Sequence, residues 1–406
     1  MTLDSLDPVL EDDLDVTAAH RPLALSLLAL ALGGFGIGTT EFATMGVLPD
    51  IASGVHVSIP TAGHLISAYA LGVVVGAPLL AVATAKLPRK LVLLLLMVAF
   101  ALGNLGSTVA PGYHSLLLAR FASGLPHGAY FGIAAVVAAS LVPVSRRGWS
   151  VSMVMTGLTI ANLAGVPLST LLGQHLGWRA AFAVVAGIGV LTVAAIAYAV
   201  PPVPVVDGAS PARELTALRS PQVLLTLLTG SVGFGGFFAV YSYITPTLTK
   251  VTGYEEAAVP VVLALFGLGM TLGNLAGGRL ADWSVDRTVA LGLVAFIVAL
   301  LVFTQAAHYV VPAALDVVLI GGIGSATIPA LQMRLMDVAG DDAQALAAAS
   351  NHSALNIANA LGAWLGGVVI AAGHGYTAPA VVGAGLAVLG LAVHGGAVLV
   401  GRRAAV

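Results

Sequence analysis

Twelve long apolar runs are the feature that most constrains the fold of this 406-residue chain. An apolar stretch of about 20 residues is long enough to cross the hydrocarbon core of a bilayer as a helix. Inside lipid every backbone N–H and C=O must bond within the protein, so such runs fold as helices. The sequence therefore predicts an all-α membrane protein with twelve transmembrane helices. The expected spans are residues 23–48, 61–83, 90–110, 113–142, 149–172, 179–200, 221–248, 257–281, 288–307, 310–335, 345–371 and 378–400.

The remaining composition excludes several classes of protein. Only 8% of the residues are charged, against about 25% in soluble domains. The chain has no cysteine, which excludes disulfides and thiolate metal sites, and we expect no metal or other cofactor. A net charge of −2 gives no reason to expect a nucleic-acid partner. No Gly-rich phosphate loop ends in Lys-Ser or Lys-Thr, so we expect neither ATP use nor an enzyme activity.

Basic residues predict the orientation in the membrane. Of the sixteen Lys and Arg, only Arg179 and Lys250 fall at the opposite ends of the spans, and Arg120 falls within one. Because cytoplasmic loops carry the excess of Lys and Arg, both termini are expected in the cytoplasm. Residues 1–20 are acidic and are expected to form a disordered cytoplasmic tail. The thirteen basic residues on the cytoplasmic side are Arg21, Lys86, Arg89, Lys90, Arg146, Arg147, Arg213, Arg219, Arg279, Arg287, Arg334, Arg402 and Arg403.

The chain divides into two similar halves. Residues 201–220 interrupt the apolar rhythm with Pro, Gly and charge, and are expected to form a cytoplasmic linker between six-helix bundles at 21–200 and 221–406. A single offset of 197 residues relates glycine, proline, asparagine and basic positions of the two halves. Repeats of this kind build secondary transporters, with a substrate site between the repeats. The matches are Gly36 and Gly233, Gly38 and Gly235, Pro49 and Pro246, Gly72 and Gly269, Gly76 and Gly273, Lys90 and Arg287, Gly124 and Gly321, Asn162 and Asn359, and Gly165 and Gly362.

Two opposite charges lie deep inside apolar spans. Glu41 precedes Pro49 by eight residues and Arg120 follows Tyr113 by seven, so both are expected about 10–12 Å below the outer surface. Desolvation favours the neutral carboxylic acid, whereas a nearby guanidinium favours the carboxylate. Glu41 and Arg120 are therefore predicted to meet as a pair that couples transport to protons or cations. The alternative is a fixed ion pair that only orients helices.

Two further ionisable residues lie within predicted spans. His127 follows Arg120 by two helical turns on the same face and could relay protons or contact substrate, or could simply pack with a hydrogen bond. Asp316 lies about one turn inside its span and could form a second acidic site, although reaching the membrane surface is the favoured interpretation.

Small and amide residues suggest how the spans pack. Gly157, Gly165 and Gly173 repeat every eight residues and are expected to let another helix approach, while Pro167 kinks the span. Ordinary glycine packing would give the same pattern. The amides of Asn162, Asn356 and Asn359 can bond across helices or bind substrate; for Asn162 and Asn359 their symmetric placement favours bonds across helices.

Four stretches resemble the twelve-span drug:proton antiporters of the major facilitator superfamily, in the branch that holds bacterial arabinose-efflux-like permeases and chloramphenicol exporters. They are GTTEFATMGVLPDIA (38–52) with Glu41, LLLARFASGLPHGAYFG (116–132) with Arg120, GLTIANLAGVPLSTLLG (157–173) and SNHSALNIANALGAWLGG (350–367). The third is similar to the antiporter hinge motif, through Gly157, Gly165, Pro167 and Gly173, with Val166 as a variant.

The loop between spans 2 and 3 departs from the superfamily pattern. ATAKLPRK (83–90) lacks the usual Asp, whereas GGRLADWSVDR (277–287) keeps Asp282 and Arg287 in the second half. We expect a cytoplasmic gate formed by charged residues of these loops. Its members are Arg89, Arg279, Asp282 and Arg287.

The resemblance implies a function. It suggests a bacterial inner-membrane protein, acting as a monomer, that exports small lipophilic or amphipathic molecules such as drugs and antibiotics in exchange for protons by alternating access. A sugar or metabolite exporter and a proton-coupled importer remain alternatives, and a sensor or scaffold would need a larger soluble part. Spans 1, 4, 7 and 10 would line the cavity. Its expected lining residues are Phe35, Phe42, Tyr130, Phe131, Phe234, Phe237, Tyr241, Tyr243 and Asn356.

Overall fold

The computed structural model describes residues 23–84, 86–143, 146–203, 220–339 and 344–404. The predicted tail and nearly all of the predicted linker lie outside these ranges. Within them the chain forms helices and short connections, with no strand. Twelve helical stretches are long and apolar enough to cross a membrane, as the sequence predicts.

The first half contains six spans. The first and fifth spans are interrupted. Helix α1 ends at Gly46 and the chain continues in a short helix, α2, which has Pro49 in its first turn. A π-helical turn, η2, separates α6 from α7. Gly177 turns the chain between α7 and α8 with a positive φ of 84°, a conformation that favours glycine. The elements are α1 (Leu23–Gly46), α2 (Leu48–Gly54), α3 (Ile59–Ala83), α4 (Arg89–Val109), α5 (Tyr113–Ser140), α6 (Arg147–Ile160), η2 (Ala161–Gly165), α7 (Val166–Leu176) and α8 (Trp178–Ala199).

The second half repeats this plan. Its first span is divided at Phe234 and Tyr243, and Pro246 follows the second break. The elements are α10 (Pro221–Gly233), α11 (Gly235–Ser242), α12 (Ile244–Thr247), η3 (Leu248–Thr252), η4 (Glu256–Ala258), α13 (Val259–Trp283), α14 (Val285–Ala306), α15 (Val310–Ala339), α16 (Gln344–Ala371) and α17 (Ala378–Ala404).

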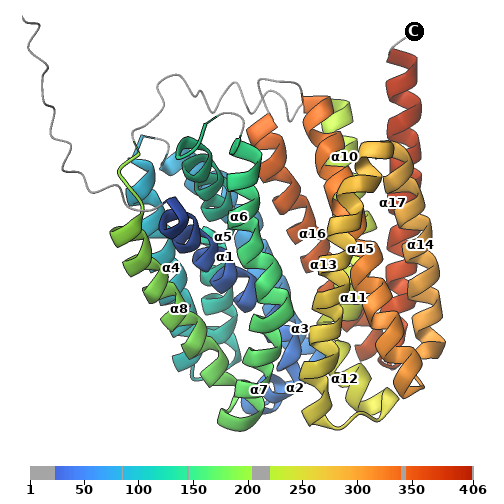
Figure 1. Ribbon diagram of the computed structural model, residues 1–406. Helices are drawn as coiled ribbons and strands as arrows, with labels where there is room; N and C mark the ends of the chain where they lie inside the picture. The colour runs from blue at the N-terminus through green and yellow to red at the C-terminus, as the bar shows by residue number, and fades with distance from the viewer. Residues whose placement is uncertain (1–22, 85, 144–145, 204–219, 340–343, 405–406) are drawn as a thin grey trace, which may run out of the picture.

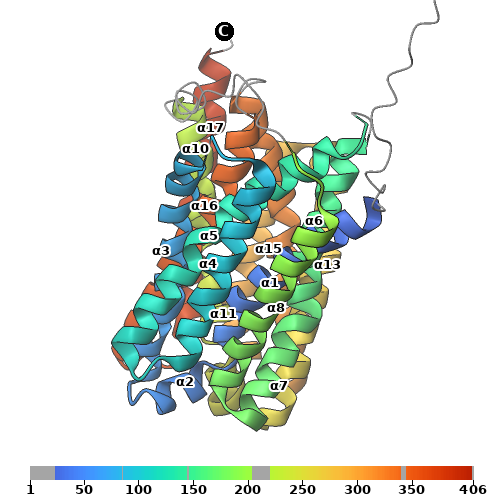
Figure 2. The ribbon, with the colours of Figure 1, turned by 90° about the vertical axis from the view of Figure 1, so that its left-hand side faces the viewer.

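The two halves form two bundles that converge at one end. Figure 1 shows them close together near α2 and α12 and farther apart toward the end where α17 finishes. In Figure 2 the first bundle faces the viewer, again with α2 and α7 at the lower end and α17 at the upper end. One apolar core joins residues of both bundles at the convergent end, including Leu48, Ile66, Tyr243 and Leu248. A separate core, with Leu30 among its members, fills the first bundle toward the other end.

Polar contacts also join the bundles at the convergent end. Thr245 donates its hydroxyl to the carbonyls of Met45 and Gly46, and Gln174 donates to the carbonyl of Glu256. Helix α3 packs along α16, where Ser67 donates to the carbonyl of Ala360. These contacts form a closed seal between the bundles on the side away from the chain termini.

Candidate functional site

Arg120 is the anchor of the site. Helix α5 places it in the interior of the first bundle, with no exposed surface. Its Nη1 donates to the hydroxyl of Thr40 at 3.0 Å and its Nη2 to the Thr40 carbonyl at 3.1 Å. The guanidinium lies 4.4 Å from the centre of the Tyr69 ring and 5.3 Å from that of Phe182. These contacts hold a charge inside the bundle that would otherwise be costly to bury.

Glu41 points to the other bundle. It is 6% exposed, and Nδ2 of Asn359 on α16 donates to its Oε1 at 3.5 Å. The predicted direct pair with Arg120 is not formed: the one ion pair among the described residues joins Arg334 and Asp286. Consecutive helical residues point about 100° apart, so Thr40 faces Arg120 while Glu41 faces the bundle interface. The matching depth of Glu41 and Arg120 is nevertheless as predicted, because Arg120 bonds to the residue before Glu41.

His127 continues the polar line of Arg120 along α5. Its Nδ1 is 3.1 Å from the Tyr69 hydroxyl, and Arg120 lies over the same Tyr69 ring, so both share one face as predicted. His127 also meets Phe131 edge to face, with ring centres 5.3 Å apart. Phe131 in turn stacks on His352 of the second bundle at 5.5 Å and 3° between planes. A continuous row of aromatic and polar rings thus connects Arg120 with the bundle interface.

Asp316 is buried, which differs from the favoured expectation that it reaches the membrane surface. It is 3% exposed, and neither carboxylate oxygen has a hydrogen-bond partner. It lies on the face of α15 that also carries the buried Ala313, Val317 and Ile320. This face points into the second bundle, so Asp316 is an acidic group without a described counter-charge.

The amides divide between the two predicted roles. Asn359 bonds across the bundles to Glu41, whereas Asn162 and Asn356 donate to carbonyls of their own helices. The Oδ1 atoms of all three are buried without a partner. Each amide therefore retains an acceptor that a hydroxyl or a protonated carboxyl group could use.

The predicted lining aromatics do not gather in one place. Phe42 contacts Tyr241 and stacks on Phe238 across the interface, and Phe237 packs against the same two rings. Phe131 stacks on His352. The other members lie elsewhere because neighbouring helical residues face different directions. Tyr130 donates to the Leu30 carbonyl inside the first bundle, and Phe35 lines a groove between α1, α7 and α8. Phe234 lies in the apolar core that joins the bundles, and Tyr243 donates to the Ala363 carbonyl at the convergent end.

The glycine motif brings α6, η2 and α7 against α1. A Cβ at Gly157 would overlap the Ala31 carbonyl, one at Gly165 the Thr39 hydroxyl, and one at Gly173 the Val47 side chain. The eight-residue repeat therefore meets an eight-residue repeat formed by α1 and Val47, the residue directly after it, as close approach along one face predicts. On its other side η2 meets α13, where a Cβ at Gly267 would overlap the Asn162 carbonyl. The π-helical turn ends one residue before Val166, next to Pro167.

The predicted gate is arranged differently. Arg279, Asp282 and Arg287 are exposed and form no ion pair with one another or with any other described residue. Arg287 lies 5.5 Å from the ring centre of Trp283. Instead Asp286 pairs with the buried Arg334 of α15. The expectation missed this pair because it counted Arg334 only as a basic residue at the cytoplasmic end of the span 310–335, whereas α15 continues to Ala339 and buries this side chain. Arg89 opens α4 in the first bundle.

Three residues of the site were missed by the sequence prediction. Thr40 receives Arg120 and donates to Asn104 Oδ1 at 2.6 Å, and Tyr69 lies between Arg120 and His127. Asn104 could have been predicted from the sequence, since it is an amide inside an apolar span. No three His, Asp or Glu side chains of the described ranges gather as a metal site would require.

Comparisons with known proteins agree with this architecture. A family model described as Major Facilitator Superfamily matches residues 30–349. The inner membrane transport protein YdhP of Escherichia coli (strain K12) is 46% identical over 370 residues, which cover 90% of this chain and 94% of that protein. A chloramphenicol resistance protein of Streptomyces lividans is 37% identical over 265 residues, 64% of this chain and 67% of that protein.

A solved structure has the same fold. The structure of a bacterial homologue of the human lysosomal transporter Spinster, inward-facing and unoccupied, aligns with a TM-score of 0.75 at 16% identity. The alignment covers 93% of this chain and 97% of that chain. The predicted all-helical, twelve-span fold is confirmed, and the chain belongs to the Major Facilitator Superfamily of membrane transporters.

Proposed function

We propose that this transporter exports small lipophilic or amphipathic molecules in exchange for protons, with Glu41 as the group that carries the proton. The observation that carries the proposal is the position of Glu41. It is a buried carboxylate at the bundle interface, bonded to Asn359 of the opposite bundle and adjacent to the residue that holds Arg120. The similarity to a protein named chloramphenicol resistance protein supports a drug as the type of substrate.

The geometry suggests how proton binding and bundle movement are linked. Glu41 and Arg120 are close enough for each charge to act on the other, although they form no ion pair. In alternating access the bundles rock against each other, which would separate Glu41 from Asn359. Binding a proton removes the negative charge of Glu41, and a change of bundle position changes the neighbours of that charge. Each event therefore alters the free energy of the other.

In this proposal four polar residues position the guanidinium of Arg120: Thr40, Asn104, Tyr69 and His127. They hold the guanidinium of Arg120 at a fixed place in the first bundle. The interface rings Phe42, Phe131, Phe238 and Tyr241 offer faces on which a lipophilic or aromatic substrate can pack.

A panel of candidate compounds in everted membrane vesicles tests the proposal. A proton gradient should drive accumulation of an exported compound by the wild type, and both Glu41→Gln and Arg120→Ala should lose it. Glu255→Gln is a matched control, because this acid is exposed between η3 and η4, outside the spans. Full activity of Glu41→Gln would remove this residue from the coupling role, and uptake by intact cells down the gradient would reverse the direction.

A sugar or metabolite exporter is the second candidate. The buried, unpartnered Oδ1 atoms of Asn356 and Asn359 could accept hydroxyl groups of a polar substrate. The same vesicle panel separates the two candidates, since accumulation of sugars but not of lipophilic drugs would favour the second.

We also propose that the protein lies in the bacterial inner membrane with both termini in the cytoplasm. The uneven distribution of Lys and Arg supports this orientation. The chain has no cysteine, so a single introduced thiol reports one position. A membrane-impermeant maleimide should label Ser53→Cys from outside and Ser140→Cys only after the membrane is permeabilised; the opposite pattern would invert the topology.

A further inference from the structure

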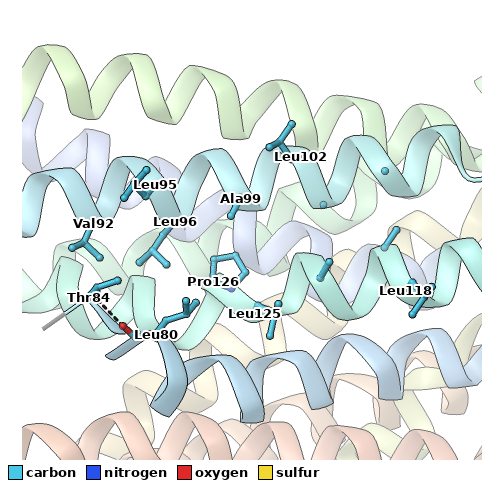
Figure 3. A pocket seen from close by; sticks show the side chains of 14 residues that line it. Leu80, Thr84, Val92, Leu95, Leu96, Ala99, Leu102, Leu118, Leu125 and Pro126 are labelled. Atoms are coloured by element: carbon cyan, nitrogen blue, oxygen red, sulfur yellow. Dashed lines mark hydrogen bonds between the residues drawn. The ribbon is translucent and has the colours of Figure 1, made fainter. Parts of the chain in front are cut away.

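A groove of about 720 Å³ runs along the first bundle between α3, α4 and α5 (Figure 3). Its lining includes exposed apolar residues such as Leu95, Leu102 and Leu118, so the groove is on the side of the bundle that faces lipid. Thr84 carries a hydroxyl in this lining, and that hydroxyl donates to the Leu80 carbonyl at 2.6 Å. The groove therefore offers a largely apolar surface, with the Thr84 hydroxyl at one end.

The groove has the length of a lipid tail. Its lining on α4 extends from Val92 to Gly106, which are fourteen positions apart, or about 21 Å at the helical rise per residue. One leaflet contributes about 15 Å, half of the hydrocarbon core. An acyl chain entering at Thr84 and Val92 can thus lie in the groove over its full depth in the leaflet.

Two cationic residues stand at the end of the groove nearest the chain termini. Lys86 follows the lining residue Thr84 by two positions and is exposed, and Arg89 precedes the lining residue Val92 by one helical turn. Nε of Arg89 is covered and has no hydrogen-bond partner. Lys90 is directed to another helix, since its Nζ donates to the Ala197 carbonyl of α8.

In the second bundle a cation near the same end is neutralised by an acid of the protein itself. At the offset of 197 residues, Arg89 corresponds to Asp286, which pairs with Arg334. Arg334 itself corresponds to the apolar Val137 of α5. The connection from residue 83 to residue 90 contains no acid. Neither Lys86 nor Arg89 forms an ion pair with a residue that the structure describes, so an anion from outside the protein can approach this end of the first bundle.

We propose that the groove binds one anionic phospholipid, with an acyl chain along α4 and α5 and the phosphate at Lys86 and Arg89. Basic pockets between membrane helices bind anionic headgroups in this manner. The site does not depend on the proposed export function. It has a consequence for Arg120, because Ala119 and Ala122 of the groove lie on either side of this residue on α5, so the lipid would brace the helix that holds the buried charge.

Native mass spectrometry of the purified full chain with phosphatidylglycerol or phosphatidylcholine tests the proposal. The wild type should retain one phosphatidylglycerol in preference to phosphatidylcholine. Lys86→Gln and Arg89→Gln should each weaken the binding of phosphatidylglycerol about fivefold, and the double variant about thirtyfold, as expected for the loss of one and two juxtamembrane cations. Retention of phosphatidylcholine should not change.

Filling the groove tests the position of the acyl chain. Ala99→Phe and Ala122→Phe place a ring in the lining at exposed positions, and each should reduce retention of phosphatidylglycerol. Ala194→Phe is the matched control, an exposed alanine of α8 outside the groove, and should bind lipid as the wild type does. Equal lipid retention by the double charge variant and the wild type would overturn the headgroup assignment. Unchanged retention in folded Ala99→Phe and Ala122→Phe, or displacement of the lipid by an exported compound, would overturn the proposed occupant of the groove.

Discussion

Thr40→Val is the most specific perturbation of the buried charge. Valine has nearly the shape of threonine, so the change removes the hydroxyl without leaving a large cavity. The Thr40 hydroxyl accepts from Arg120 at 3.0 Å and donates to Asn104 at 2.6 Å, while the backbone carbonyl that also receives Arg120 remains. A hydrogen bond to a charged group contributes about 1.5–3 kcal/mol and a neutral one about 0.5–1.5 kcal/mol. Because both partners stay buried, the expected loss of stability is the sum of the two, about 2–4.5 kcal/mol.

Thermal unfolding of the purified protein in lipid nanodiscs measures this loss. Thr304→Val is the control, since the Thr304 hydroxyl bonds only to a carbonyl of its own helix, that of Leu301. A surface change of this kind should alter the free energy of unfolding by no more than about 0.5 kcal/mol. Thr40→Val should therefore melt well below both the wild type and the control. Equal midpoints for the two valine variants would refute the idea that Thr40 holds Arg120 in place.

Three further outcomes follow from the same structure. Gly157→Ala should destabilise the protein by about 1–3 kcal/mol, because the added Cβ would overlap the α1 backbone. Gly187→Ala is the control, since a Cβ at Gly187 meets open space, and equal melting temperatures of the two variants would contradict the close approach of the helices. Asp286→Asn should cost about 1–3 kcal/mol by leaving Arg334 without its partner, and a wild-type melting temperature would show that the pair is unimportant. Burial, followed by a nearby carboxylate, raises the pKa of Asp50 above its ordinary value, so its charged form opposes folding; Asp50→Asn should be more stable at neutral pH, with the gain vanishing near about pH 4.

Features that depend on position along a helix could be predicted from the sequence. The twelve spans follow from the lengths of the apolar runs, and the common depth of Glu41 and Arg120 follows from counting residues to the ends of their spans. The glycine spacing likewise predicted a face of close contact, which α1 fills. These properties depend on the rise per residue, which every helix shares.

Features that depend on rotation about the helix axis could not be predicted. Depth alone did not show that Arg120 faces Thr40 while Glu41 faces Asn359. The same limit applies to the aromatic residues, since Tyr130 and Phe131 are adjacent in sequence but point into the bundle and to the interface respectively. Which face of a helix meets which neighbour is decided by packing in three dimensions.

The coupling role of Glu41 is tested most directly by comparing two transport modes in proteoliposomes that contain an exported compound from the vesicle panel. One mode is efflux driven by a pH gradient, and the other is exchange of labelled for unlabelled compound at equal pH. Glu41→Gln should lose the first and keep the second, because an amide preserves the shape of the carboxyl group but carries no exchangeable acidic proton. Undiminished efflux of Glu41→Gln down a pH gradient would contradict the account.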